Sequence, residues 1–255
     1  MGLVRVGVVA LVLVSAVCLG LDFGGTQSNG GASPLPPGVD DGSLNATALA
    51  AAHERSLVDT PVAIETSRAT WNTDPGGNQT VTTKTLTDGN GTLWRRTVTG
   101  DSEQSHVERW TDGRRSLRYV AATGETVSAD VVTRPGQRYL TPRLATWLDT
   151  GRYSLTAVES ATPGRYVLTT TTYTPPDGEP LEADTVRYEA TAVVTARGRV
   201  QAMSATLVTI ETNRWGRHVR SRSYSYRVVR TGGVTPPTPD WLPDRSAAAV
   251  EGDDG

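Results

Sequence analysis

Most of this chain alternates apolar and polar residues with a period of two, and that pattern limits the folds open to it. From Val186 to Val194 every second residue is apolar or aromatic, and only Val193 breaks the alternation. Successive side chains of a strand point to opposite faces, so the pattern indicates a strand with one buried face. Similar alternation predicts further strands at 62–71, 79–87, 93–99, 105–110, 116–121, 127–133, 165–173, 200–211 and 218–230.

Short glycine- and proline-rich turns separate these strands. They lie at 74–77, 88–91, 112–113, 175–178 and 197–198. Tight turns between neighbouring strands favour antiparallel hairpins in sequence order, so the sequence predicts a meander.

Two segments have helical spacing instead. Four residues of the first recur at i, i+3, i+4 and i+8: Leu49, Ala52, His53 and Leu57. Ser43 or Asn45 is available as its N-cap, and Pro61 stops it. The second segment starts at Thr141-Pro142, a cap followed by proline at the first helical position, and Gly151 ends it. Its apolar stripe is Leu144, Trp147 and Leu148.

These elements together predict an α+β fold. We expect a curved antiparallel β meander, a half-barrel, with the two helices covering its concave face. The span 43–243 is long enough for one domain with a core of its own. Residues 22–42 are rich in glycine and proline and indicate a tether, and 244–255 are typical of a disordered acidic tail.

The first 21 residues resemble an export signal. Arg5 precedes an apolar run of about 16 residues, shorter than the roughly 20 that a membrane-spanning helix needs. Cys18, the only cysteine, ends a segment similar to a lipobox, so we predict lipid attachment there; an uncleaved signal anchor is the alternative. In both cases the domain faces outward from the cell membrane.

Composition argues against several classes of function. A net charge of −2 gives the chain no general attraction to nucleic acid. The three histidines are spread over separate elements, so we predict no metal site, and no cofactor-binding motif occurs. The chain has no Gly-x-Ser-x-Gly nucleophile motif either. The sequence therefore predicts a protein that is not an enzyme.

Three short motifs resemble a known family. They are the Leu-Pro-Pro-Gly-Val entry at 35–39, the Ala-Leu-Ala-Ala-Ala-His helix at 48–53, and the Pro-Asp-Trp-Leu exit at 239–242. Together they resemble the predicted surface lipoproteins of haloarchaea, a family without assigned function. The low acidity of this chain leaves an actinobacterial origin open. The architecture also looks like that of periplasmic lipoprotein carriers and mycobacterial lipid-binding lipoproteins.

That second resemblance implies an apolar cavity that binds acyl chains or another apolar ligand. The residues expected to line or gate it are Leu49, Leu57, Leu144, Trp147 and Leu148. One strand alternates arginines with aromatic residues, which predicts contacts to anionic lipid headgroups; the alternative is that these arginines are a solvated strand end. These residues are Arg220, Arg222, Tyr224 and Tyr226. Sequons predict glycosylation at Asn45, Asn78 and Asn90.

Two functions fit the sequence. The first is a membrane-anchored lipoprotein that binds a lipid or other apolar ligand without catalysis. The second is a structural or protein-interaction module of the cell envelope with no ligand cavity.

Overall fold

The computed structural model describes residues 35–40, 43–73, 77–100, 105–130, 143–158, 164–175, 183, 185–214 and 216–242. The chain divides into two units, Met1–Ala32 and Ser33–Gly255. The first unit, including Cys18, lies wholly outside the described residues, and every element named below belongs to the second. Within the described residues, no helix is both long and apolar enough to cross a membrane.

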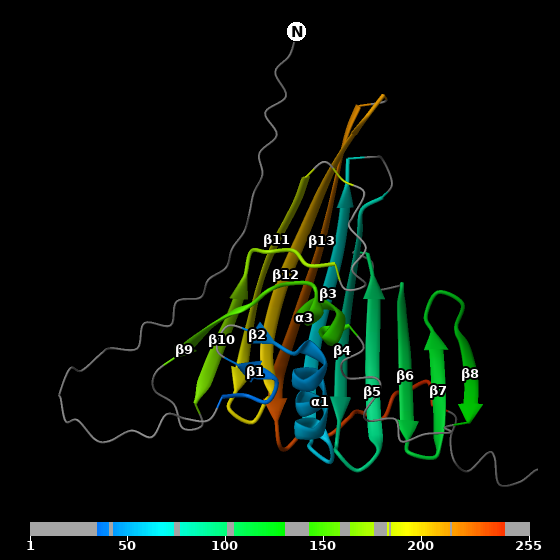
Figure 1. Ribbon diagram of the computed structural model, residues 1–255. Helices are drawn as coiled ribbons and strands as arrows, with labels where there is room; N and C mark the ends of the chain where they lie inside the picture. The colour runs from blue at the N-terminus through cyan, green and yellow to red at the C-terminus, as the bar shows by residue number, and fades with distance from the viewer. Residues whose placement is uncertain are drawn as a thin grey trace, which may run out of the picture. The chain divides into compact units, whose positions relative to one another are not determined.

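One antiparallel sheet dominates the second unit (Figure 1). Its eleven strands within the described residues are β3 (Val62–Asn72), β4 (Gln79–Thr87), β5 (Thr92–Thr99), β6 (His106–Asp112), β7 (Arg115–Val120), β8 (Glu125–Asp130), β9 (Ser154–Val158), β10 (Arg165–Thr170), β11 (Thr185–Thr195), β12 (Val200–Asn213) and β13 (Gly216–Thr231). The antiparallel prediction is confirmed, and the sheet stays open, with β8 and β9 at its two edges. The alternation missed only the short β9 among these strands.

The predicted single meander is wrong at one point. The strand order is β8-β7-β6-β5-β4-β3-β13-β12-β11-β10-β9. The first meander (β3–β8) and the second meander (β9–β13) therefore meet where β3 pairs with β13. This seam is extensive, because the register runs from the Val62–Thr231 pair to the Asn72–Arg220 pair. Turn signals report only local hairpins, and the seam joins the first long strand to the last.

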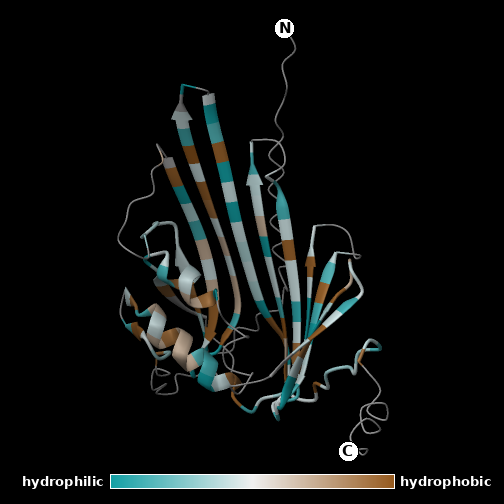
Figure 2. Ribbon diagram, turned by 90° about the vertical axis from the view of Figure 1, so that its right-hand side faces the viewer, coloured by the Kyte–Doolittle hydropathy of each residue, from teal (hydrophilic) through white to brown (hydrophobic). Residues whose placement is uncertain are grey.

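The register separates the two faces of the sheet. Tyr226 of β13 lies opposite Thr66 of β3, and its hydroxyl lies 2.8 Å from His53 on the first helix. This face therefore carries the helices. Glu65, the neighbour of Thr66 in β3, belongs to the other face. Residues paired across strands share a face, and the pairs that start at Glu65 lead through β4 and β5 to Glu108 of β6, so Glu108 also lies on that other face. Figure 2 shows the helices on one side of the sheet.

The first helix, α1 (Ala46–Leu57), follows the predicted bounds. The side chain of Asn45 accepts a hydrogen bond from the Ala48 backbone N–H at 2.9 Å, which confirms the N-cap. The helix ends at Leu57, a few residues before Pro61. Its predicted apolar stripe faces the sheet and is buried.

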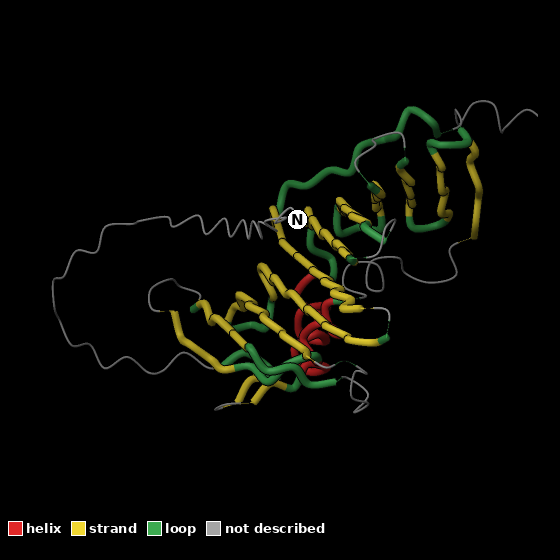
Figure 3. Tube along the Cα trace, turned by 90° about the horizontal axis from the view of Figure 1, so that it is seen from above, coloured by secondary structure: helices red, strands yellow, loops and turns green. Residues whose placement is uncertain are grey.

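The second helix, α3 (Leu144–Asp149), is six residues long. Leu144 and Leu148 are buried, as the stripe predicts. Its predicted start at Thr141-Pro142 lies outside the described residues. Thr150 closes its end, since the Thr150 hydroxyl donates to the Thr146 carbonyl at 2.7 Å. Figure 3 shows both helices against the strands of the second meander and away from β5–β8.

The entry segment belongs to the folded domain. Two short strands, β1 (Val39–Asp40) and β2 (Ser43–Leu44), pair with each other, and Val39 is part of the main core. Gly38 makes this possible with φ +83°, because a Cβ there would lie 2.8 Å from the Asn45 carbonyl oxygen. The fold thus begins before Ser43, inside the segment 22–42 expected to be a tether.

The exit segment covers the face opposite the helices. Trp241 stacks on Tyr119 of β7, with ring centroids 5.4 Å apart and planes 12° from parallel. The Trp241 indole N–H also donates to Glu108 at 2.7 Å. The Pro-Asp-Trp-Leu motif therefore docks onto the sheet through its tryptophan.

Candidate functional site

The five residues predicted to line a cavity gather in one place, between the helices and the sheet. Leu49, Leu144 and Leu148 are at most 1% exposed, Leu57 is 3% exposed, and Trp147 packs against the same core. Side chains so fully covered leave no water-sized void beside them. In this conformation the helix–sheet layer is closed, and a role for these residues in binding stays a prediction.

Aromatic rings fill the α3 end of this layer. The Trp147 ring lies nearly parallel to Tyr224, with centroids 5.7 Å apart, and to Tyr188, at 6.3 Å. The hydroxyls of Tyr188 and Tyr153 both donate to the Trp147 carbonyl, at 2.8 and 3.1 Å. Burial raises the pKa of Tyr188 to about 12, so it remains a neutral donor. α3 is thus held to the sheet by rings and by hydroxyls.

A polar clasp joins α1 to the sheet within this apolar layer. The Val200 backbone N–H donates to His53 Nδ1 at 3.1 Å, and His53 Nε2 lies 2.8 Å from the Tyr226 hydroxyl. Because Nδ1 accepts, the neutral ring carries its proton on Nε2 and donates it to Tyr226. Burial, and secondarily the charge of Arg199, lowers the pKa of His53 to about 3. His53 is therefore a buried neutral clasp between α1 and the sheet.

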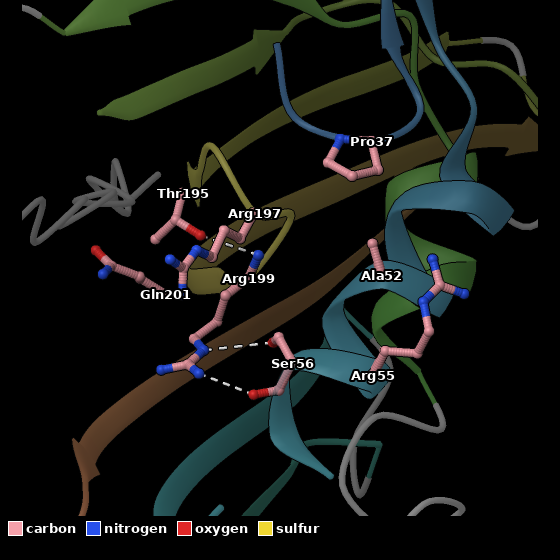
Figure 4. Close-up of a pocket in the computed structure, with 8 residues that line it drawn as sticks. All are labelled: Pro37, Ala52, Arg55, Ser56, Thr195, Arg197, Arg199 and Gln201. Atoms are coloured by element: carbon pink, nitrogen blue, oxygen red, sulfur yellow. Dashed lines mark hydrogen bonds between the residues drawn. The ribbon is translucent and has the colours of Figure 1, made fainter. Parts of the chain in front are cut away.

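A pocket of about 730 Å³ opens beside α1, near this clasp (Figure 4). We call it the arginine pocket. Its described lining comes from the entry segment, the C-terminal half of α1 and the β11–β12 hairpin: Pro37, Ala52, Arg55, Ser56, Thr195, Arg197, Arg199 and Gln201. Three of these residues are arginines and none is acidic, so the pocket offers positive charge to an anionic group.

Close packing fixes the geometry of the arginine pocket. Arg199 donates to the Ser56 carbonyl at 2.8 Å and from Nε to the Ser56 hydroxyl at 3.3 Å, which ties the hairpin to α1. Gly198, with φ +81°, forms the hairpin turn, and a Cβ there would lie 2.7 Å from the Cβ of Ala52. The glycine thus lets the hairpin approach the helix and brings Arg197 and Arg199 to the pocket.

The structure divides the predicted headgroup-contact residues. Arg220 is exposed and Arg222 is half-buried, whereas Tyr224 and Tyr226 are at most 4% exposed under the helices. Burial raises the pKa of both tyrosines. The two rings therefore belong to the core and offer a headgroup no exposed surface in this conformation.

The three predicted glycosylation residues, Asn45, Asn78 and Asn90, are all exposed. The Asn78 side chain accepts a hydrogen bond from the Asn72 backbone N–H at 2.9 Å, as Asn45 does from Ala48. Both contacts use the amide oxygen and do not involve the nitrogen, the atom that a glycan joins. Glycosylation itself stays a prediction.

Sequence reasoning missed the arginine pocket. Arg55 and Arg199 lie far apart in the chain, and only the fold brings the helix and the hairpin together. The Arg-Gly-Arg turn at 197–199 was the available local signal, since a hairpin turn presents its flanking side chains. Among the described residues, no three histidine, cysteine, aspartate or glutamate side chains gather in a way that would hold a metal ion.

Comparisons with known proteins give distant likenesses. Solved structures similar to this chain include a LolA superfamily protein from Nitrosomonas europaea, at 12% identity over 78% of this chain and 100% of that one, with a TM-score of 0.29. A putative outer membrane lipoprotein-sorting protein domain from Vibrio parahaemolyticus matches at 7% identity over 77% and 96%, with a TM-score of 0.25. The MucA/MucB complex of Pseudomonas aeruginosa matches at 16% identity over 78% and 61%, with a TM-score of 0.31.

At such TM-scores these likenesses carry no argument about the function of this chain. No protein-family model matches the sequence, and no curated protein matches it. The haloarchaeal resemblance therefore stays a prediction.

Proposed function

We propose that this domain binds an amphiphile without chemical change to it, with an anionic headgroup in the arginine pocket and the apolar part between α1 and the sheet. One observation carries the proposal: a pocket with three arginines and no described acidic residue adjoins the helix that covers the apolar core. An amphiphile has the two halves that such a pair of surfaces requires.

Binding requires α1 to move away from the sheet, because the layer between them is closed. Each buried CH₂ of the ligand contributes about 0.8 kcal/mol, so burial of an acyl chain offsets the loss of the contacts of the helix. This movement breaks the clasp of His53 with Tyr226 and Val200, and also the hydrogen bonds of Arg199 to Ser56. His53 follows Ala52, which lines the arginine pocket, so the opening would lie next to the proposed headgroup site.

The setting we propose for this activity is the outer side of the cell membrane. Residues 1–21 would anchor the chain, through a lipid on Cys18 or through the apolar run itself. The domain would then meet its ligand within reach of the membrane that contains it.

Native mass spectrometry of the full-length chain, extracted from a cell membrane in mild detergent, tests the proposal. We expect a discrete added mass that organic solvent releases as an anionic lipid. Arg55→Gln and Arg197→Gln should reduce its occupancy roughly tenfold, by removing charge-assisted hydrogen bonds. The control is Arg187→Gln, an exposed arginine of β11 that does not line the pocket, which should retain the lipid.

The closed helix–sheet layer favours a second candidate, an envelope interaction module that binds a protein and no amphiphile. A protein mass with no added lipid in the wild type, and the same in all three variants, would favour this module and contradict the carrier.

A further inference from the structure

A second group of arginines lies at the other end of the helix–sheet layer, over the rings beside α3. Arg68 of β3 is directly opposite Tyr224 of β13 in the register, and Arg222 is two residues from Tyr224. Residues two apart on a strand share a face, so Arg68 lies across from Tyr224 and Arg222 lies next to it along β13.

The segment before α3 supplies the third member. The Trp147 backbone N–H donates to the Arg143 carbonyl at 3.1 Å, which places Arg143 one helical turn before Trp147. Trp147 itself lies on Tyr224, with planes 6° from parallel. Burial has the largest effect on the pKa of Arg68 and of Tyr224, and the charge of Arg143 also acts on both, lowering each pKa. Arg68 and Arg222 thus lie beside Tyr224 on the sheet, and Arg143 precedes the helix whose Trp147 covers that ring; we call these three arginines the α3 cluster.

Of the three arginines in the α3 cluster, none forms an ion pair with a described carboxylate. Arg68 and Arg222 are nevertheless half-buried, and burial lowers the pKa of each guanidinium. Partly desolvated cations without partners are unfavourable by themselves, and an anionic ligand relieves that penalty.

The α3 cluster is separate from the arginine pocket. The two lie at opposite ends of the layer: β12 pairs Ala202 with Arg227 of β13, so Val200 at the clasp lies about seven residues along the strands from Arg222. At about 3.3 Å per residue this is roughly 20 Å. One small headgroup cannot occupy both sites.

We propose that Arg68, Arg143 and Arg222 bind a phosphate group above the Trp147–Tyr224 ring pair. Guanidiniums arriving from three segments match the several peripheral oxygens and the high charge of a phosphate better than the two oxygens of a carboxylate. The source of the phosphate is either a lipid headgroup or free phosphate, and the site takes both through the same contacts.

Binding to the full-length chain in nanodiscs of neutral phosphatidylcholine tests this assignment. The probes are dioctanoyl phosphatidate, inorganic phosphate and, as the uncharged match, dioctanoylglycerol, each titrated by calorimetry. We expect phosphatidate to bind more tightly than dioctanoylglycerol. Arg68→Gln and Arg222→Gln should each weaken the phosphatidate roughly tenfold, through the lost charge-assisted hydrogen bonds. If inorganic phosphate shows the same losses, the source is free phosphate; if only phosphatidate binds, it is a headgroup.

Arg227→Gln is the matched control, since it removes the same charge from the opposite face of the same strand and should leave binding within about twofold. Arg143→Gln guards against misfolding, because this exposed residue precedes α3 and packs in no core. Equal affinity for phosphatidate and dioctanoylglycerol would overturn the proposal. So would losses in Arg197→Gln without losses in the three α3-cluster variants, although that result would leave the arginine pocket and the proposed function standing.

Discussion

The two meanders of this sheet are covered on opposite faces. The second meander and β3 bury their apolar residues under α1 and α3, where a continuous core forms around Leu49, Tyr188 and Tyr226. The first meander instead presents Trp110 to the other face, where the exit segment docks. Alternation with a period of two gives every strand two candidate faces, and it does not say which of them a neighbouring element will cover.

The two coverings also differ in chemistry. Under the helices the contacts are mainly aliphatic and aromatic, with neutral polar contacts from the His53 clasp and from the hydroxyls of Tyr153 and Tyr188. Under the exit segment a carboxylate organises the contacts: Glu108 accepts from the indoles of both Trp94 and Trp241, at 3.3 and 2.7 Å. We therefore expect the helix-covered half to supply most of the stability, and the tail-covered half to depend on one charged acceptor.

The largest expected effect tests that division. Leu49→Ala removes a fully buried side chain from the helix-covered core and should lower the free energy of unfolding by about 4 kcal/mol. Leu117→Ala, in the tail-covered half, should cost about 2 kcal/mol, and Val229→Ala at a half-exposed position less than about 0.5 kcal/mol. Urea unfolding followed by circular dichroism measures all three. Equal losses for Leu49 and Leu117 would contradict the difference between the halves.

The clasp makes the helix-covered half sensitive to acid. The pKa of His53 falls from about 6.5 to about 3 on folding, so the unfolded chain takes up a proton in this range and the folded chain does not. The free energy of unfolding is therefore independent of His53 titration above pH 6.5. It decreases as the pH falls from 6.5 toward 3, because protons bind only to the unfolded chain. The free energy of unfolding falls by about 1.4 kcal/mol per pH unit in this range, so at pH 4 it is roughly 3 kcal/mol lower than at pH 6.5.

His53→Asn checks this assignment, because its amide oxygen retains an acceptor for the Val200 N–H and does not titrate. The variant should be less stable at pH 7 but lose less stability than the wild type between pH 6.5 and 4. His218→Asn is the control that removes a half-buried histidine elsewhere. An identical acid profile for wild type and His53→Asn would show that the buried imidazole does not govern the response.

A smaller effect is expected at the exit segment. Trp241→Ala removes both the stack on Tyr119 and the hydrogen bond to Glu108, and should cost about 2 kcal/mol. Trp241→Phe retains a ring and loses only the donor, so about 1 kcal/mol is expected. Thermal unfolding of the two variants separates the contributions. If the two variants melt together, the stack adds nothing and the hydrogen bond alone holds the segment.

The sequence predicted those features of the fold that depend on residues close together in the chain. The cap at Asn45 and the alternation from Val186 to Val194 act within a few residues, and both appear as expected. The β3–β13 seam and the contact of Arg199 with Ser56 join residues more than 140 positions apart, and no local pattern encodes them. The same limit explains Tyr226: its alternation with arginines and the helix α1 were both predicted, but the contact of that helix with Tyr226, 173 positions from His53, was not.

The smallest effect separates the intrinsic stability of α1 from its packing. Asn45→Ala removes the N-cap and should cost about 1 kcal/mol, because the Ala48 N–H loses its side-chain acceptor. The change also destroys a predicted sequon, so Asn45→Asp serves as the matched variant: it loses the sequon and retains an acceptor for the cap. If capping is the cause, the aspartate variant retains the stability that the alanine variant loses. If both variants fall equally in protein from a glycosylating host, and neither falls in protein from a host without glycosylation, the glycan and not the cap stabilises this end of α1. In that case the helix depends on its packing against the sheet, and opening for a ligand would require that this packing and the His53 clasp be replaced.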